Sequence, residues 1–299
     1  MAQPRQFLNG TTYLLTRRVL RRQFRLKPSD QVNQILLYCL AYAAARYQIK
    51  IHAFCFLSNH YHLVLTDPDS RLSEFMGWLN KYTAKCINSL HGEWGVLWEP
   101  GSYSAVVLAN DQAVLDKLLY TLCNPVEAEL VPRGTQWRGL RTAVEEVGRA
   151  SYQVDRPDVF FRKKGPLPQT AKLTLAPLEC FQHLSAEELT ALLSEGVRAR
   201  EEEVNRRVKK KRRGFLGWRN VVKQSRVDTP TTHERRRGIN PRLACRDKWK
   251  RIELLGALKE FLKKYREALG RFVKGERDVV FPAGTYLMRV RLKVNCAPI

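Results

Sequence analysis

The sequence predicts an α+β fold, in which a mainly antiparallel sheet with helices on one face precedes a basic, mostly helical region. Two observations carry this prediction. In the first half of the 299-residue chain, segments with the hydrophobic period of strands alternate with segments that have the period of helices. In the second half the charge rises: residues 1–150 hold 17 Lys and Arg against 12 Asp and Glu (net +5), whereas residues 151–299 hold 35 against 17 (net +18). We therefore expect two domains, divided at residue 150.

Four short segments of the first half are predicted strands, because they are rich in β-branched and aromatic residues. They are Thr11–Arg18, Ile51–Leu57, Tyr61–Thr66 and Tyr103–Leu108. Only three residues separate the second from the third, which suits a tight hairpin. Three longer segments have apolar residues at three- and four-residue steps and are predicted helices. They are Ser29–Tyr47, Leu72–Leu90 and Asp111–Cys123. This order of elements is the split βαβ pattern of ferredoxin-like folds, with one trailing helix.

The second half is less regular. Pro166–Pro177 is a plausible linker because prolines cluster in and around it. Ser185–Val208 is a predicted helix that opens with a capping-box spacing, and Lys248–Phe272 is a longer helical pattern. Val279–Val294 alternates like a pair of strands.

The formal charge of +23 and the pI near 10.0 indicate a polyanionic partner, which for so basic a chain is most commonly nucleic acid. The seven cysteines are scattered and form no CxxC pair, which argues against a zinc ribbon. The start of the chain does not resemble a signal peptide, and no apolar run reaches the length of a membrane span. We therefore expect a cytoplasmic protein with reduced thiols and no membrane partner.

Two histidines, His60 and His62, are the sharpest local feature. They lie two residues apart on a predicted strand, so their side chains share one face, roughly 6–7 Å apart by strand rise. Two imidazoles that converge on one point can ligate a divalent cation. The alternative is that they are polar residues on a solvated strand face.

A tyrosine and an asparagine form the second feature. Tyr120 and Asn124 lie four residues apart at the end of a predicted helix, which places both on one face. The alternative is that Tyr120 is a half-buried aromatic residue and that Asn124 caps the helix before Pro125.

These two features together carry a resemblance. The segment Asn59–Leu65 (NHYHLVL), followed by Leu118–Val131 (LLYTLCNPVEAELV), resembles the single-tyrosine HUH transposases, and most closely the REP-associated tyrosine transposases of bacteria. His60-Tyr61-His62 matches the HUH element of that family. Tyr120, followed by Asn124-Pro125, matches its nucleophile helix. The resemblance covers roughly residues 5–140, and the order and spacing of the two motifs make it much more specific than either motif alone.

The resemblance implies that residues 1–150 form an HUH transposase catalytic domain with the HUH nuclease fold. Its implied activity is metal-assisted cleavage and rejoining of single-stranded, hairpin-forming DNA. Tyr120 would attack the phosphate to give a 5′-phosphotyrosine link and a free 3′-hydroxyl. One Mg²⁺ or Mn²⁺ would be held by His60, His62 and Asn124.

Two acidic residues and a second tyrosine qualify this interpretation. The family is usually richer in Arg after Asn-Pro, whereas this chain has Glu127 and Glu129, which we expect to face away from DNA. Tyr82 competes as a nucleophile because Lys81 and Lys85 flank it and could bind phosphate. It lacks an asparagine four residues later, since position 86 is a cysteine.

Clusters of basic residues are predicted to contact DNA phosphates, in a manner largely independent of base sequence. They are Arg17, Arg18, Arg21, Arg22, Lys81, Lys85, Arg206, Arg207, Lys209, Lys210, Lys211, Arg212, Arg213, Arg235, Arg236 and Arg237. The alternative for the clusters in the second half is a solvated surface or a linker. On the first interpretation, residues 151–299 are a DNA-binding accessory region.

The sequence thus favours a tyrosine transposase or endonuclease that acts on single-stranded or hairpin DNA as a monomer or a homodimer. A domesticated, non-catalytic protein that binds repeat hairpins is the second hypothesis. A replication-initiator or relaxase type of nickase is a more distant third. For each, we expect a bacterial, nucleoid-associated location.

Overall fold

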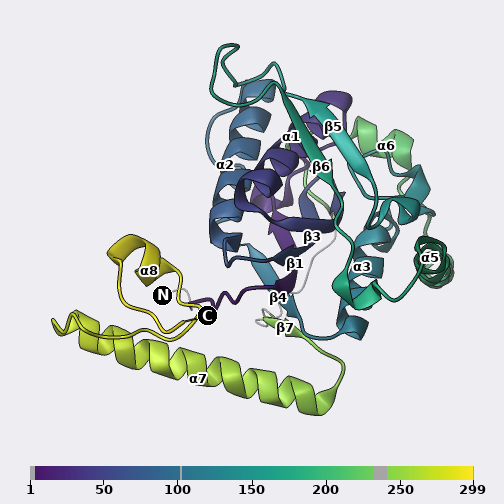
Figure 1. Ribbon diagram of the computed structural model, residues 1–299. Coiled ribbons are helices and arrows are strands. Elements are labelled where there is room, and N and C mark those ends of the chain that lie inside the picture. Colours follow the sequence, from purple (N-terminus) through teal and green to yellow (C-terminus); the bar gives the residue numbers. More distant parts are fainter. Residues whose placement is uncertain (1–3, 102, 232–240, 299) are drawn as a thin grey trace.

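The computed structural model describes residues 4–101, 103–231 and 241–298 (Figure 1). Its strands are β1 (Thr11–Arg18), β2 (Lys50–Phe56), β3 (His60–Asp67), β4 (Ser104–Leu108), β5 (Ser151–Asp155), β6 (Thr170–Thr174) and β7 (Leu243–Ala244). Its α-helices are α1 (Asp30–Tyr47), α2 (Leu72–His91), α3 (Asp111–Leu122), α4 (Asn124–Glu127), α5 (Ala186–Lys210), α6 (Trp218–Lys223), α7 (Lys248–Val273) and α8 (Leu287–Leu292).

One five-stranded sheet organises the first half of the chain. Its order is β2-β3-β1-β4-β7, and every neighbouring pair is antiparallel except the parallel pair β4 and β7. The order of the first four strands is the one that a split βαβ unit produces. The predicted α+β class with a mainly antiparallel sheet is therefore confirmed.

The two faces of the sheet bury different helices (Figure 1). On one face, sheet residues such as Leu15 and Leu63 share a core with α1 and α2. On the other face, Leu14 and Val64 share a second core with α3 and with Leu193 of α5. The helices of the split βαβ unit thus lie on one face as predicted, while the trailing helix α3 covers the opposite face. This alternation follows from the two-residue period of strands.

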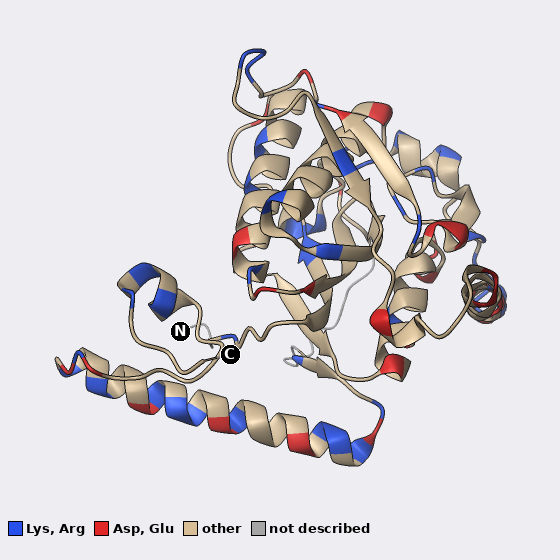
Figure 2. Cartoon of the chain, viewed as in Figure 1, with Lys and Arg blue, Asp and Glu red and all other residues tan. Residues whose placement is uncertain are grey.

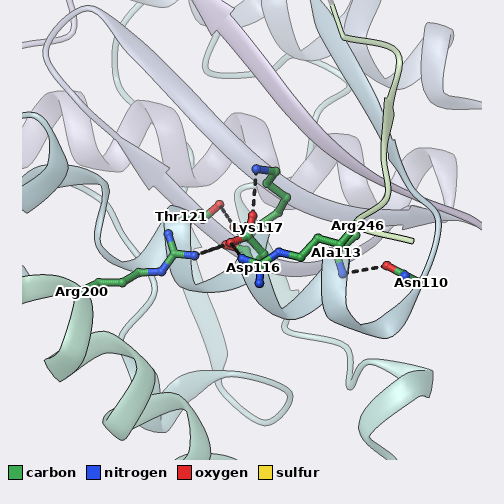
Figure 3. Close-up of polar contacts among 7 residues, drawn as sticks. All are labelled: Asn110, Ala113, Asp116, Lys117, Thr121, Arg200 and Arg246. Carbon is green, nitrogen blue, oxygen red and sulfur yellow. Dashed lines mark hydrogen bonds and ion pairs between the residues drawn. The ribbon is translucent and has the colours of Figure 1, made fainter. Parts of the chain in front are cut away.

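Helix α3 has clear local reasons to begin and end where it does. The Asn110 side chain caps its start by accepting a hydrogen bond from the backbone N–H of Ala113 at 2.9 Å (Figure 3). Pro125 follows soon after its end and cannot continue the backbone ladder, so the short helix α4 starts there in a new segment. The end of α3 is therefore fixed beside the sheet.

Packing continues across residue 150, where we placed the domain boundary. Val154 of β5 and Leu173 of β6 are buried in the same core as α1 and α2. Strand β6 also lies within Pro166–Pro177, so the prediction of a linker there was wrong. The proline-rich composition concealed a strand that pairs with β5 along its whole length.

The end of the chain forms a small core of its own, which includes Ala268 of α7, Phe281 and Met288. In Figure 1, α7 lies apart from the sheet. The predicted strand pair over Val279–Val294 is wrong, because helix α8 occupies part of it. The segment forms only isolated bridges in the described residues, from Phe281 to Cys296 and from Thr285 to Gln6. The predicted helices Ser185–Val208 and Lys248–Phe272 are confirmed as α5 and α7. In the described ranges no helix has both the length and the apolarity to cross a bilayer.

Candidate active site

The paired histidines lie on β3 with their side chains toward α3. Their ring centroids are 5.0 Å apart. Asn59 Oδ1 accepts a 2.6 Å hydrogen bond from His60 Nδ1, because an amide oxygen can only accept. The Thr16 hydroxyl on β1 forms a 2.8 Å hydrogen bond with His62 Nδ1. Bonds of this kind at Nδ1 orient an imidazole so that Nε2 can serve as a ligand.

The protonation state of His62 suits the same role. Burial lowers the pKa of His62 well below its ordinary value, and the nearby His60 and Arg18 lower it further. His62 is 4% exposed, so its imidazole is neutral at neutral pH. A neutral imidazole is the form that binds a cation.

Tyr120 approaches this pair from α3. Its ring centroid lies 5.0 Å from that of His62, and its Oη lies 3.5 Å from His62 Nε2. Burial raises the pKa of Tyr120, and Glu127 raises it further, whereas Arg18 and a hydrogen bond with the Asn124 side chain lower it. The raised pKa keeps the phenol protonated at neutral pH.

Asn124 completes the arrangement as the first residue of α4. It is 3% exposed, yet its Oδ1 atom is buried without a hydrogen-bond partner among the described residues. A buried acceptor without a partner is costly and calls for a missing donor or cation. No cluster of three or more His, Cys, Asp or Glu that could hold a metal occurs in the described part of the chain. An asparagine amide oxygen and two imidazoles make up a donor set whose chemistry fits one divalent cation.

Asp116 links helix α3 to two segments of the second half (Figure 3). Arg200 of α5 forms an ion pair with its Oδ1 atom at 2.5 Å. Arg246, which follows β7, forms an ion pair with the same atom at 3.2 Å. Lys117 lies 2.9 Å from the other carboxylate oxygen. Lys117 and Arg200 hold the pKa of the Asp116 carboxyl below its usual value. Asp116 lies about one helical turn before Tyr120, so these ion pairs help to fix the position of α3.

A close approach between α5 and α3 supports the same conclusion. A Cβ atom placed on Gly196 would lie 2.7 Å from Leu119 Cδ1, so a larger residue there would displace the Leu119 side chain. The sequence analysis did not identify Asp116, Gly196 or Thr16. The first two act through contacts between distant parts of the chain. Thr16 lies two residues before Arg18 and therefore on the same face of β1. Only the pairing of β1 with β3 places that face beside His62.

The predicted DNA-binding residues of β1 do not form one surface. Arg18 is exposed and pairs in register with His60, so it lies on the face of the histidines. Arg17 points to the opposite face, where its guanidinium lies 5.9 Å from the ring centroid of Trp98. Arg21 and Arg22 follow in a turn, both with positive φ (53° and 61°).

The basic block at the end of α5 is partly neutralised. Arg207 pairs with Glu127 at 3.3 Å and Lys211 pairs with Glu129 at 2.8 Å. Both carboxylates thus face α5, and that they face away from DNA stays a prediction. Five other predicted residues of this block are exposed, namely Arg206, Lys209, Lys210, Arg212 and Arg213. Three of them, Arg206, Lys209 and Arg213, line a hollow of about 360 Å³ together with Phe215. Arg235, Arg236 and Arg237 lie outside the described residues.

The competing tyrosine lies on the wrong side of the sheet for the histidines. Tyr82 stacks on Trp78 with ring centroids 4.3 Å apart, and it packs against the core of α1 and α2. Lys81 and Lys85 lie beside it, with ammonium groups 5.8 and 6.0 Å from its ring centroid. The structure brings together His60, His62, Tyr120 and Asn124, and it does not bring Tyr82 to them.

The sheet order, the paired histidines and the facing tyrosine are the features on which the comparison with known proteins bears. Residues 11–117 match the family described as Transposase IS200 like. This segment is therefore similar to IS200-like transposases, and the resemblance noted in the sequence is confirmed. A comparison with curated proteins found no match.

Solved structures give weaker likenesses. One is a REP-associated tyrosine transposase bound to a REP hairpin, with 19% identity over 49% of this chain and 84% of that chain and a TM-score of 0.42. A transposase candidate from Deinococcus radiodurans has 21% identity over 40% and 95% of the chains, with a TM-score of 0.30. A tRNA(His) guanylyltransferase from Saccharomyces cerevisiae has 12% identity over 44% and 65%, with a TM-score of 0.34.

Proposed function

We propose that this transposase-family protein cleaves and rejoins single-stranded, hairpin-forming DNA through a 5′-phosphotyrosine intermediate. The observation that carries the proposal is the convergence of Tyr120 Oη on His62 Nε2 at 3.5 Å, next to the unpartnered Oδ1 of Asn124. A nucleophile and a ligand set on one point of the sheet form a site for phosphoryl transfer.

His60, His62 and Asn124 would hold one Mg²⁺ or Mn²⁺ in this proposal. Such a cation, when bound, polarises the scissile phosphate and offsets the charge that develops on it. Because two of the three donors are imidazoles, we expect Mn²⁺ to be accepted at least as well as Mg²⁺. Asn59 and Thr16 position the two imidazoles through their Nδ1 atoms.

Tyr120 would act as the nucleophile. Its phenol proton passes to water, Oη forms a bond to phosphorus, and the bond from phosphorus to the 3′-oxygen breaks. The 3′-oxygen takes a proton from water and leaves as a free hydroxyl. Arg18 and the Asn124 side chain favour the phenolate, because both lower the pKa that burial raises. A 3′-hydroxyl of a second strand can reverse these steps and rejoin DNA without a nucleotide cofactor.

The experiment is covalent capture. The full chain is incubated with a labelled hairpin carrying a single-stranded flank and with Mn²⁺, and the products are separated on a denaturing gel. We expect an adduct in the wild type and in Tyr82→Phe, and none in Tyr120→Phe. Absence of an adduct with either Mg²⁺ or Mn²⁺, while hairpin binding persists, would favour the non-catalytic DNA-binding alternative.

The cellular setting is part of the same proposal. All seven cysteines are free thiols in the structure, and five of them are buried. A reducing compartment suits such a chain. We propose a bacterial cytoplasmic location at the nucleoid, where a DNA substrate lies, for a monomer or a homodimer.

A further inference from the structure

A loop on the opposite side of the sheet from the histidines has features that the proposed chemistry does not use. It spans residues 156–169, between β5 and β6, and projects at the top of Figure 1. Arg156, which is 7% exposed, anchors it by donating hydrogen bonds to the carbonyls of Leu167 (2.6 Å) and Lys163 (2.7 Å). Tyr38 of α1 donates to the carbonyl of Pro168 at 2.6 Å. The loop is therefore tied down in one shape.

Phe160 is held in this loop in an unfavourable way. Its φ is +64°, a left-handed conformation that a bulky residue adopts only under constraint, and its side chain is 43% exposed. Its ring contacts Phe161 and Tyr82 edge-on, at centroid distances of 5.6 and 6.3 Å. The surrounding structure thus presents an aromatic ring to solvent instead of burying it.

Five exposed cations lie on this loop or on the adjoining helix α2. Lys85 of α2 has its ammonium group 5.1 Å from the Phe160 centroid, and Lys81 lies one turn earlier on the same helix face. Three more follow Phe161 directly in the loop, namely Arg162, Lys163 and Lys164. The only carboxylate between residues 156 and 169 is that of Asp158. None of the five cations forms an ion pair within the described residues.

We propose that this surface, the 156–169 lobe together with Lys81 and Lys85, binds a single-stranded segment of nucleic acid. A base stacks on Phe160, and the cations hold the flanking phosphates, as in surfaces that combine aromatic rings with positive charge. Figure 2 shows Lys and Arg at this loop. The proposal rests on the proposed function for its class of substrate. It adds a second contact on the α1 and α2 side, away from the histidines.

Equilibrium binding tests the lobe without any chemistry. A fluorescent 20-nucleotide oligothymidylate and a duplex of equal length are titrated with the full chain in EDTA at several salt concentrations. We expect Phe160→Ala to bind the single strand about tenfold more weakly, while Phe160→Tyr keeps the wild-type affinity because it still stacks. Lys163→Gln/Lys164→Gln should lower the slope of log affinity against log salt by about 1.4, since each single-strand contact contributes about 0.7.

A matched control removes the same charge elsewhere. Lys263→Gln/Lys274→Gln lies on α7 and just after it, where both residues are exposed, and should bind more tightly than the lobe variant. Wild-type affinity in Phe160→Ala and in Lys163→Gln/Lys164→Gln would overturn the lobe, even if an adduct still forms at Tyr120. Loss of the adduct with lobe-dependent binding intact would contradict only the proposed catalysis. Thermal melting of each variant verifies that it is folded.

Discussion

The two faces of the sheet use neighbouring residues of one strand for different purposes. Tyr61 and His62 are both buried, at 1% and 4% exposed, yet they point to opposite sides of β3. Tyr61 donates a hydrogen bond to Asn80 of α2, whereas His62 contacts Thr16 and Tyr120. The side of the sheet on which a tyrosine lies therefore decides whether it can contact the histidines, and proximity in sequence matters less.

The same comparison applies to the positive charge. On the α3 side, several cations pair with carboxylates: Arg200 and Arg246 with Asp116, and Arg207 with Glu127. On the other side, the cations of the 156–169 lobe have no carboxylate partner in the described residues. Part of the positive charge of the second half thus holds helix α3 in place, and a different part is available to a polyanion.

The largest effect is expected when both proposed metal ligands on β3, His60 and His62, are removed. His60→Ala/His62→Ala should reduce the metal-dependent adduct by more than about 100-fold, which exceeds the usual effect of residues that only support ligands. His52→Gln is the matched control, because His52 is also a buried histidine near β3 but bonds to Thr66 and to the carbonyl of Ala176. Equal loss of adduct in both variants, with both folded, would contradict a special role for the pair.

The second-largest effect is expected from the Thr16 hydroxyl, which bonds to His62. Thr16→Val removes the hydrogen bond to His62 Nδ1 and should weaken Mn²⁺ binding, measured by calorimetry, by about 10–100-fold. Thr12→Val is the control, since Thr12 lies on the same face of β1 and bonds to Thr66 at 2.8 Å. If the two variants bind Mn²⁺ equally well, Thr16 does not orient the ligand.

His52, which lies farther along the same face of the sheet, should make the free energy of unfolding depend on pH. Burial lowers its pKa to about 4, so the folded chain leaves it neutral while the unfolded chain takes up a proton near pH 6.5. The free energy of unfolding should therefore be highest above pH 6.5 and fall by up to about 3 kcal/mol as the pH drops to about 4. Urea titrations of wild type and His52→Gln measure this, and an identical pH slope in both would refute it.

The stabilities of two Gly→Ala variants test the close contact between α5 and α3. Gly→Ala in a helix interior usually stabilises by roughly 0.5–1 kcal/mol. Gly256→Ala on α7 should show this gain, because nothing lies within 4 Å of its added Cβ. Gly196→Ala should gain less than this or lose stability, because its Cβ would displace the Leu119 side chain. Equal melting temperatures for the two variants would contradict the close packing.

Local periodicity made the central part of this molecule predictable. The two-residue period of β3 placed His60 and His62 on one face, and the helical period placed Tyr120 and Asn124 together. The second half was less predictable because its contacts join distant positions, as between Gly196 and Leu119. Short apolar runs are also ambiguous in period, so Leu287–Leu292 was predicted as part of a strand and folds as a helix.

The most direct test of the account is to locate the nucleotide on the protein. After covalent capture with Mn²⁺ and nuclease trimming, tryptic peptides are analysed by mass spectrometry for a phosphonucleotide on tyrosine. We expect to find the label on Tyr120, which lies on the α3 side of the sheet with the histidines. A label on Tyr82, which packs on the opposite face, would contradict it.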